Sequence, residues 1–218
     1  MLDRFDLVVF DWDGTLSDSP AAIVRAIQDA AADLGLPVPD DATASHVIGL
    51  GLHEALARAV PDLPPARVAE YSARYRVHYL AREDQLTLFP GARELIAALR
   101  GAGVPLAIAT GKSRHGLQRA LRQVGLADAF EATRCADQTH PKPHPAMLLE
   151  LTAELMVEPA RTLMVGDTTH DLQMAAAAGT ASVGLTQGAH PSEALAACAP
   201  TMLFDSLADL HRWLMPPR

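Results

Sequence analysis

Residues 7–16, with the sequence LVVFDWDGTL, join a short apolar run to two acidic residues. The run Leu7 to Phe10 has the length and composition of a buried strand. Asp11 and Asp13 follow at its end, and Gly14 frees the backbone to turn there. Ligands of open parallel sheets bind beyond the carboxyl ends of the strands, so two carboxylates at this point indicate a cation or a charged ligand. The alternative interpretation is a solvated Asp-Gly turn.

Similar apolar runs recur along the chain at 106–109, 163–165, 181–185 and 202–204. The stretches between them have helical spacing, with apolar residues three or four positions apart: Leu117, Leu121 and Val124 on one face, and Leu148, Leu151 and Leu155 on another. Strands that are apolar on both faces and alternate with helices are typical of a parallel sheet covered on both sides. We therefore predict an α/β fold with a doubly wound parallel sheet.

The stretch from about residue 20 to residue 84 interrupts this alternation, because it contains no convincing strand. Its apolar residues recur at helical spacing instead, and turns rich in Pro, Gly and Asp separate the helical segments. The apolar positions are Ile23, Ile27, Ala31 and Leu34, then Leu52, Leu56 and Val60, then Val68, Tyr71, Tyr75 and Tyr79. The sequence predicts an all-helical cap of residues 17–85, inserted into a core of residues 1–16 and 86–218.

The composition limits the class of partner. The chain has 218 residues, of which 49% are hydrophobic, and a formal net charge of −8 without any run of Lys or Arg. This balance argues against nucleic acid and anionic membranes as partners. Cys135 and Cys198 form neither a disulfide framework nor a zinc motif, and the N-terminus lacks the features of a secretion signal. We expect a cytoplasmic monomer or homodimer with a small-molecule substrate.

Two further segments suit an anionic ligand. Thr110 and Gly111 follow the second apolar run and precede a helix, where a hydroxyl and backbone amides can bind an anion. Capping of the helix by Thr110 or Ser113 is the alternative. Lys142 stands between two prolines that restrict its backbone, so its ammonium could neutralise a phosphate oxygen. A solvated lysine on a surface turn is the alternative there.

A second acidic pair follows the strand candidate 163–165. Asp167 leaves the strand end and Asp171 comes one helical turn later, so both carboxylates can face one point. Like charges repel, and the pair therefore favours a hard cation such as Mg²⁺. Asp171 could instead serve only as a partner for the helix dipole.

Together these segments resemble the motifs of the haloacid dehalogenase superfamily, in particular its phosphoglycolate phosphatase-like members with a helical cap. Residues 11–16 resemble the first motif, Thr110 the second, Lys142 the third, and Gly166-Asp167 with Asp171 the fourth. The similarity covers nearly the whole chain. It implies an Mg²⁺-dependent phosphatase that hydrolyses a small, phosphoglycolate-like phosphomonoester through an aspartyl-phosphate intermediate.

The resemblance also implies roles for the acidic residues. Asp11 would be the nucleophile, and Asp13 the general acid and then the general base. Mg²⁺ would be held by the Asp11 carboxylate, the Asp13 backbone carbonyl and the Asp167 carboxylate, with Asp171 orienting this shell.

Phosphate binding is implied for Thr110, Gly111 and Lys142, with Thr110 and Lys142 also counted as catalytic. A pyrophosphatase, a nucleotidase or a sugar-phosphate mutase on the same fold are alternatives. A phospho-acceptor signalling domain and a catalytically idle binding protein are alternatives of another class.

The cap is expected to select the substrate. Its loop 49–53 resembles the substrate loop of phosphoglycolate phosphatase-like proteins, and its arginines could bind a carboxylate or a second phosphate. These candidates are Arg58, Arg74, Arg76 and Arg82, although a position on a solvated helix face is the favoured interpretation for any one of them. The roles of His170 and His190 stay open, and we expect His170 at the surface.

Overall fold

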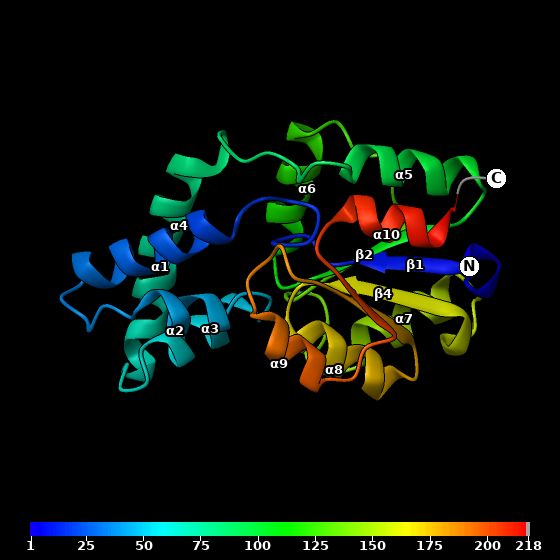
Figure 1. Cartoon of the computed structure of the whole chain (residues 1–218). Coiled ribbons are helices and arrows are strands. Elements are labelled where there is room, and N and C mark those ends of the chain that lie inside the picture. Colours follow the sequence, from blue (N-terminus) through cyan, green and yellow to red (C-terminus); the bar gives the residue numbers. More distant parts are fainter. Residues whose placement is uncertain (217–218) are drawn as a thin grey trace.

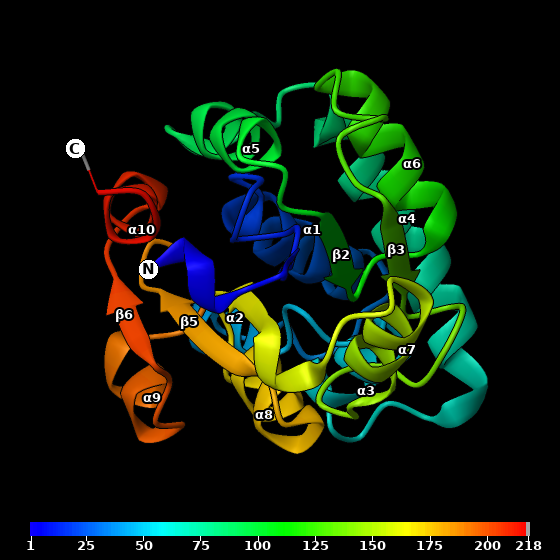
Figure 2. The ribbon, with the colours of Figure 1, turned by 90° about the vertical axis from the view of Figure 1, so that its right-hand side faces the viewer.

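Six parallel strands form a single sheet in a computed structural model that describes residues 1–216. Their order is β3-β2-β1-β4-β5-β6, so β1 lies at the centre and the chain order reverses beside it (Figures 1 and 2). The strands are β1 Leu7–Phe10, β2 Leu106–Thr110, β3 Ala132–Cys135, β4 Thr162–Gly166, β5 Ala181–Leu185 and β6 Met202–Phe204. This topology confirms the predicted doubly wound α/β fold. Residues 217–218 of the predicted core range lie outside the described part.

Helices cover both faces of the sheet (Figure 2). Because successive strand side chains point to opposite faces, Val8 and Phe10 pack toward one layer while Leu7 and Val9 pack toward the other. The first layer contains α5 (Ala92–Gly101), α6 (Arg114–Gln123) and α10 (Leu207–Leu214). The second layer contains α7 (Ala146–Glu154), α8 (Thr169–Ala178) and α9 (Ser192–Ala197). Short 3₁₀ turns lie elsewhere in the chain, at Leu2–Arg4, Pro65–Arg67 and Pro159–Arg161.

Strand β3 was not predicted. It is an outer strand of the sheet, paired on one side with β2, and its middle residues Thr133 and Arg134 are only half-buried. Arg134 turns toward α7, where it pairs with Glu150 at 2.7 Å and Glu154 at 2.6 Å. A polar edge strand lacks the continuous apolar run that marks the central strands, which explains why the pattern missed it.

The cap is all-helical, and its helices enclose a hydrophobic cluster of their own. It contains α1 (Pro20–Asp33), α2 (Asp41–His46), α3 (Leu52–Ala59) and α4 (Val68–Glu83). Ile27, Leu56 and Tyr71 are buried at its centre, and the Tyr71 hydroxyl donates to the Ile27 carbonyl at 2.9 Å. Helix α2 was not predicted, because its six residues are too short for a periodic pattern.

The two connections between cap and core run side by side. The amide of Asp18 donates to the carbonyl of Thr87, and the amide of Phe89 donates to the carbonyl of Leu16, both at 2.9 Å. These bonds support the division of the chain near residues 16/17 and 85/86, which remains our proposal. None of the described helices has the length and apolar character needed to cross a membrane.

Candidate active site

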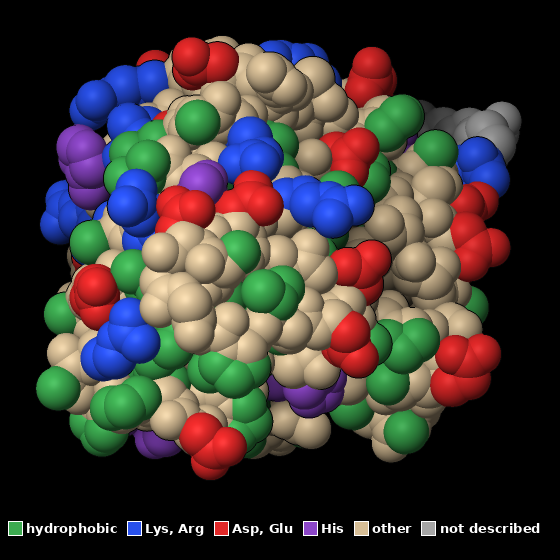
Figure 3. Space-filling view, turned by 90° about the vertical axis from the view of Figure 1, so that its left-hand side faces the viewer, with side chains coloured by type: hydrophobic (Ala, Val, Ile, Leu, Met, Phe, Trp, Pro, Cys, Tyr) green, Lys and Arg blue, Asp and Glu red, His purple; other side chains and the backbone are tan. Residues whose placement is uncertain are grey.

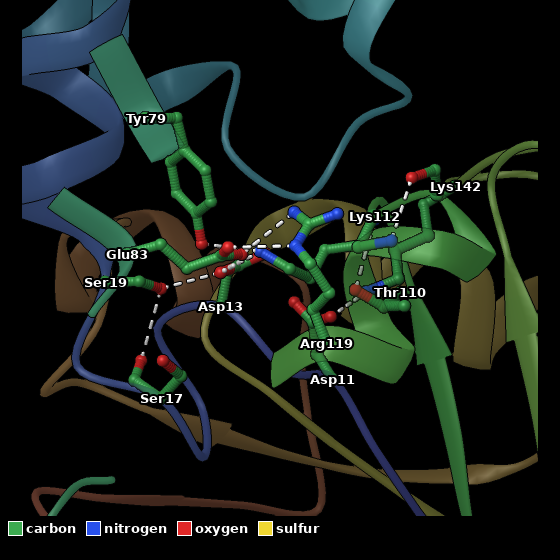
Figure 4. A network of polar contacts seen from close by, with 12 residues as sticks. Asp11, Asp13, Ser17, Ser19, Tyr79, Glu83, Thr110, Lys112, Arg119 and Lys142 are labelled. Carbon is green, nitrogen blue, oxygen red and sulfur yellow. Dashed lines mark hydrogen bonds and ion pairs between the residues drawn. The ribbon is translucent and has the colours of Figure 1, made fainter. Parts of the chain in front are cut away.

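The ends of three neighbouring strands bring the predicted residues to one edge of the sheet. Asp11 follows β1 directly, Thr110 is the last residue of β2, and Asp167 follows β4. Strands β2 and β4 flank β1, so the three side chains share one edge. The Asp11 amide donates to the Val165 carbonyl at 2.9 Å, which keeps the chain in register just beyond the strand. Figure 4 shows Asp11, Asp13, Thr110 and Lys142 around this edge.

Lys142 lies between two buried carboxylates. Its Nζ is 2.8 Å from Oδ1 of Asp11 and 2.6 Å from Oδ1 of Asp171. The lysine side chain is 0% exposed, which excludes the alternative of a solvated lysine on a surface turn. The Lys142 ammonium group therefore lies directly beside the Asp11 carboxylate in the site.

Asp167 is held by fixed donors and by two glycines. The Thr15 hydroxyl donates to its Oδ1 at 2.7 Å, and the Ala189 amide donates to its Oδ2 at 2.8 Å. A Cβ atom on Gly14 would lie 2.1 Å from Oδ2, and one on Gly188 would lie 2.2 Å from it. Glycine is therefore required on both sides of this carboxylate, and Gly14 also adopts a φ of +84° that other residues rarely adopt.

Asp171 has two functions at once. Its Oδ2 accepts from the amide of Thr168 at 3.0 Å and from the Thr168 hydroxyl at 2.7 Å, which completes a capping box at the start of α8. Its Oδ1 is left to pair with Lys142. One side chain therefore both caps α8 and pairs with Lys142.

Burial dominates the electrostatics of this cluster. It raises the pKa of Asp11 to about 7, with Lys142 opposing the rise and Asp171 and Asp13 adding to it. Burial together with Asp11 and Asp171 also raises the pKa of Asp167 well above its usual range. Burial acts to lower the pKa of Lys142, but Asp11 and Asp171 outweigh it and hold the pKa above its ordinary value. The cluster therefore favours added positive charge.

The cluster also fits a divalent cation. Carboxylate oxygens of Asp11, Asp167 and Asp171 lie within 4.8 Å of one another. Oδ2 of Asp11 is buried and has no hydrogen-bond partner within residues 1–216. Hard oxygen donors around an unpartnered carboxylate are the ligands that Mg²⁺ prefers.

Asp13 belongs to a second polar network that sequence reasoning missed (Figure 4). Nζ of Lys112 lies 3.1 Å from Oδ1 of Asp13, and it donates to the Tyr79 hydroxyl at 2.7 Å. The Ser19 hydroxyl donates to Oδ1 of Asp13 at 2.7 Å. Asp13 is thus held by Lys112, just beyond the end of β2, and by Ser19 of the cap. Tyr79 of the cap holds Lys112 in turn, so the network spans the join between cap and core.

The rarity of lysine in this sequence is the feature that could have identified Lys112 as a site residue. Lys112 and Lys142 are the only lysines in the sequence, since all other basic residues are arginines or histidines. Both lie in this site and both pair with a carboxylate. Burial acts to lower the pKa of Lys112, but Asp13 and the hydroxyls of Tyr79 and Tyr75 outweigh it and raise the pKa above its usual value.

Thr110 and Gly111 lie where the cap closes onto the core. The Thr110 side chain is fully buried, and its hydroxyl accepts from the Lys112 amide at 3.2 Å. A Cβ on Gly111 would lie 2.5 Å from the Leu50 carbonyl oxygen and 2.6 Å from that of Gly49. The backbone of the cap loop therefore touches the backbone of the predicted phosphate-binding turn. Helix α6 is capped by Ser113, whose hydroxyl accepts from the Gly116 amide at 3.2 Å.

A cavity of about 800 Å³ opens between this edge and the cap. Asp11, Asp13 and Thr110 lie on its core side, and the loop 49–53, which resembles a substrate loop, lies on its cap side. Tyr79 belongs to the hydrophobic cluster of the cap and also lines this cavity.

Of the four candidate cap arginines, Arg76 alone lines the cavity within the described part of the chain. The others form ion pairs on helix faces: Arg58 with Glu54, Arg74 with Asp33, and Arg82 with Asp29. Figure 3 shows the outer face of the cap, where basic and acidic side chains lie side by side. Sequence reasoning missed Arg119, which lines the cavity from α6 and pairs with Glu83 at 2.9 Å.

His170 and His190 join the core to the cap. Nε2 of each ring donates to the His46 carbonyl at the end of α2, at 3.0 and 3.1 Å. The Thr169 amide donates to Nδ1 of His190 at 3.0 Å, which assigns the proton of that ring to Nε2. Burial lowers the pKa of His170, and burial beside His170 lowers the pKa of His190 to about 4. The expectation of a surface position for His170 is wrong, because the side chain is buried against the cap.

The fold and the site define an α/β enzyme with a helical cap and an acidic site at the strand edge. A family model described as haloacid dehalogenase-like hydrolase matches residues 5–179. The curated relative "Probable phosphatase IndB" of Dickeya dadantii is 40% identical over 210 residues, covering 94% of this chain and 91% of the relative. A phosphoglycolate phosphatase of Yersinia pseudotuberculosis is 35% identical over 209 residues, covering 93% and 90%.

Solved structures agree with these relatives. The crystal structure of a predicted phosphoglycolate phosphatase from Haemophilus somnus has a TM-score of 0.87 and 29% identity, covering 97% of this chain and 99% of that one. The chain belongs to the haloacid dehalogenase-like hydrolases, as its motifs predicted, and it groups with the phosphoglycolate phosphatase-like members. It is therefore an enzyme of the hydrolase class.

Proposed function

We propose that this chain is an Mg²⁺-dependent phosphatase that hydrolyses a small phosphomonoester through an aspartyl-phosphate on Asp11. The observation that carries the proposal is the buried Asp11 carboxylate, with one oxygen 2.8 Å from Lys142 and the other without a hydrogen-bond partner among the described residues. Asp11 also faces a cavity that can admit a substrate. The relatives named as phosphatases support the same reaction class.

Asp11, the backbone carbonyl of Asp13 and Asp167 would hold Mg²⁺ in this site. The bound cation would supply positive charge that offsets the repulsion between the Asp11 carboxylate and a phosphate. Lys142 adds a fixed positive charge beside Asp11, and the Thr110 hydroxyl with the Gly111 amide would donate to phosphoryl oxygens. Asp171 keeps Lys142 in place through the contact of 2.6 Å.

In the first step, an Asp11 oxygen would attack the phosphorus atom while the bond from phosphorus to the ester oxygen breaks. Asp13 would give its proton to the departing alkoxide, which leaves as an alcohol. In the second step, water would attack the same phosphorus, Asp13 would take the proton from that water, and Asp11 would be released with inorganic phosphate. Nζ of Lys112 lies 3.1 Å from Oδ1 of Asp13 and would help to hold this carboxyl group in position during both steps.

The proposal is tested by phosphate release from p-nitrophenyl phosphate and from 2-phosphoglycolate, each with Mg²⁺ and with EDTA. We expect steady release with Mg²⁺ and loss of release with EDTA, restored by excess Mg²⁺. Brief incubation with substrate followed by acid quench should leave one phosphoryl group on the peptide that contains Asp11, detected by mass spectrometry. A folded protein that releases no phosphate from a wide panel of phosphomonoesters would contradict the proposal.

Mg²⁺ should stabilise the chain more at pH 8 than at pH 5. The pKa of Asp11 rises from an ordinary 3.8 to about 7 on folding, so the metal-free folded state holds a proton that the unfolded state has lost. This retained proton stabilises the metal-free folded state relative to the unfolded state. The stabilisation is complete below about pH 4 and is lost as the pH rises to about 7. A cation must displace this proton, so its apparent affinity should fall about tenfold per pH unit below 7. Thermal melting with Mg²⁺ and with EDTA at both pH values measures the difference, and an equal increase in Tm at both would refute it.

Gly111→Ala should keep the fold but weaken the seating of the cap. The new Cβ would meet the carbonyl oxygens of Leu50 and Gly49 at 2.5 and 2.6 Å, while the amide of residue 111 is kept. We expect kcat/KM for p-nitrophenyl phosphate to fall about 10- to 100-fold, because small displacements of a closing element misplace the reacting groups. Gly101→Ala is the matched control, since its Cβ would meet no atom of the described residues within 4 Å. Equal kinetics for the two variants would show that the contact does not matter.

A further inference from the structure

The cap side of the cavity is lined mainly by aliphatic side chains. They come from two of its helices, α1 and α3, and from the loop before α3: Ile23, Ile27, Ile48, Leu50, Leu52 and Leu56. With a volume of about 800 Å³, the cavity is far larger than a phosphate joined to a glycolate-sized group needs. Cavities of roughly 300–1,000 Å³ that are lined in this way bind ligands with substantial apolar surface.

Among residues 1–216, the cations that line the cavity do not form a carboxylate site in its interior. Lys112 is engaged by Asp13 and by the Tyr79 hydroxyl, and Arg119 is paired with Glu83. The remaining basic side chains that line the cavity are exposed to solvent: Arg76, His53 and His115. A carboxylate placed against the aliphatic wall would lose its hydration without gaining a free cation, which is unfavourable.

Aromatic rings complete the lining. Tyr75 and Tyr79 stack with their centroids 5.8 Å apart and an angle of 20° between their planes, and both line the cavity. The hydroxyl of Tyr79 is taken by Lys112, so its ring offers mainly apolar contact to a ligand. Such a wall suits a ring-sized apolar group better than a short acid.

We propose that the substrate is a phosphomonoester whose leaving alcohol carries an aromatic ring, with the ring in the cap side of the cavity. This inference rests on the proposed function, because the phosphate is placed beside Asp11 and Thr110. It changes the expectation that the resemblance supplies, since a phosphoglycolate-like leaving group is short and acidic. The cap would select the substrate by burial of apolar surface.

The experiment compares esters of primary alcohols, so that the chemical reactivity of the leaving group stays similar. Ethyl phosphate, 2-phosphoglycolate and 2-phenylethyl phosphate are supplied to the full chain with Mg²⁺, and kcat/KM is measured for each. We expect 2-phenylethyl phosphate to exceed both of the others by at least about tenfold. Equal values, or a preference for 2-phosphoglycolate, would overturn the inference while leaving the proposed phosphatase function intact. No hydrolysis of any ester by the folded protein would contradict the proposed function itself.

A pair of variants on α4 locates the ring. Leu80 lines the cavity and is 46% exposed, whereas Val77 is 56% exposed and does not line it. Leu80→Lys adds a cation at the cavity, so the preference for 2-phenylethyl phosphate over 2-phosphoglycolate should fall about fivefold or more. Val77→Lys adds the same charge to the same helix outside the cavity and should leave that preference unchanged. An unchanged preference in Leu80→Lys would overturn the placement of the ring against this part of the cap.

Discussion

Asp11→Asn is expected to lower kcat/KM for p-nitrophenyl phosphate by at least about a thousandfold, because an amide cannot act as the nucleophile. The substitution preserves the shape of a side chain that is 1% exposed. It also removes a carboxylate whose pKa is already raised to about 7 by burial, so the loss of charge should be tolerated. The variant should therefore fold, with an unchanged circular dichroism spectrum. Steady-state phosphate release measures the loss of kcat/KM. The search for a phosphorylated peptide tests whether residue 11 can still act as the nucleophile.

Asp18→Asn provides the matched control for this experiment. Asp18 lies in the same segment, but its side chain is exposed and is not one of the three carboxylates of the acidic cluster, so the rate of this variant should match that of the unchanged chain. Hydrolysis by Asp11→Asn within tenfold of this control would show that another group attacks the phosphorus. Such a result would remove Asp11 from the role of nucleophile while leaving the fold assignment untouched.

Lys142→Met should destabilise the protein as well as inactivate it. Its Nζ separates the carboxylates of Asp11 and Asp171, and breaking a buried ion pair by removal of one partner typically costs about 3–5 kcal/mol. Loss of the ammonium should also reduce kcat/KM by at least about a hundredfold, since a fixed charge beside the transferred phosphoryl group is lost. Urea unfolding in EDTA measures the stability, and added Mg²⁺ should restore part of it.

The other lysine gives a comparison within the same site. Lys112→Met removes the partner of Asp13, whose side chain is 10% exposed and keeps the donor of Ser19. Its cost in stability should therefore be smaller than that of Lys142→Met, because solvent and the serine hydroxyl still satisfy the carboxylate. If the two lysine variants lost equal stability, the pairing of Lys142 with two carboxylates would contribute no more to the free energy of unfolding than the pairing of Lys112 with Asp13.

The sequence allowed the central sheet to be predicted, and the reason is its burial. Strands β1, β2, β4 and β5 are covered on both faces, so their side chains are mostly apolar and stand out as short runs. Strand β3 carries Thr133 and Arg134 at the edge of the sheet, where both residues are only partly buried. Helix α2 has six residues and depends on the Asp40 cap, so it offers no periodicity to read. Both omissions are elements that local pattern does not mark.

Site residues at strand ends were predictable because the carboxyl ends of parallel strands all lie at the same edge of the sheet. Contacts between cap and core were not, since Lys112 and Tyr79 lie far apart in sequence and their meeting depends on how the cap docks. The same holds for His46, whose carbonyl accepts from His170 and His190. The burial of Lys142 is likewise a consequence of tertiary structure, because a lysine between two prolines is equally compatible with a surface turn.

The restriction of lysine to this site has a consequence for the chemistry of the whole surface. Apart from the N-terminus, the only primary amines are those of Lys112 and Lys142, whose side chains are 9% and 0% exposed. Guanidinium groups supply the remaining fixed positive charge, so reagents that acylate amines find almost nothing to modify on the closed molecule. Lifting the cap would free Lys112 from Tyr79 and uncover its amine. The rate at which an acylating reagent modifies Lys112 would therefore report how often the cap lifts from the core.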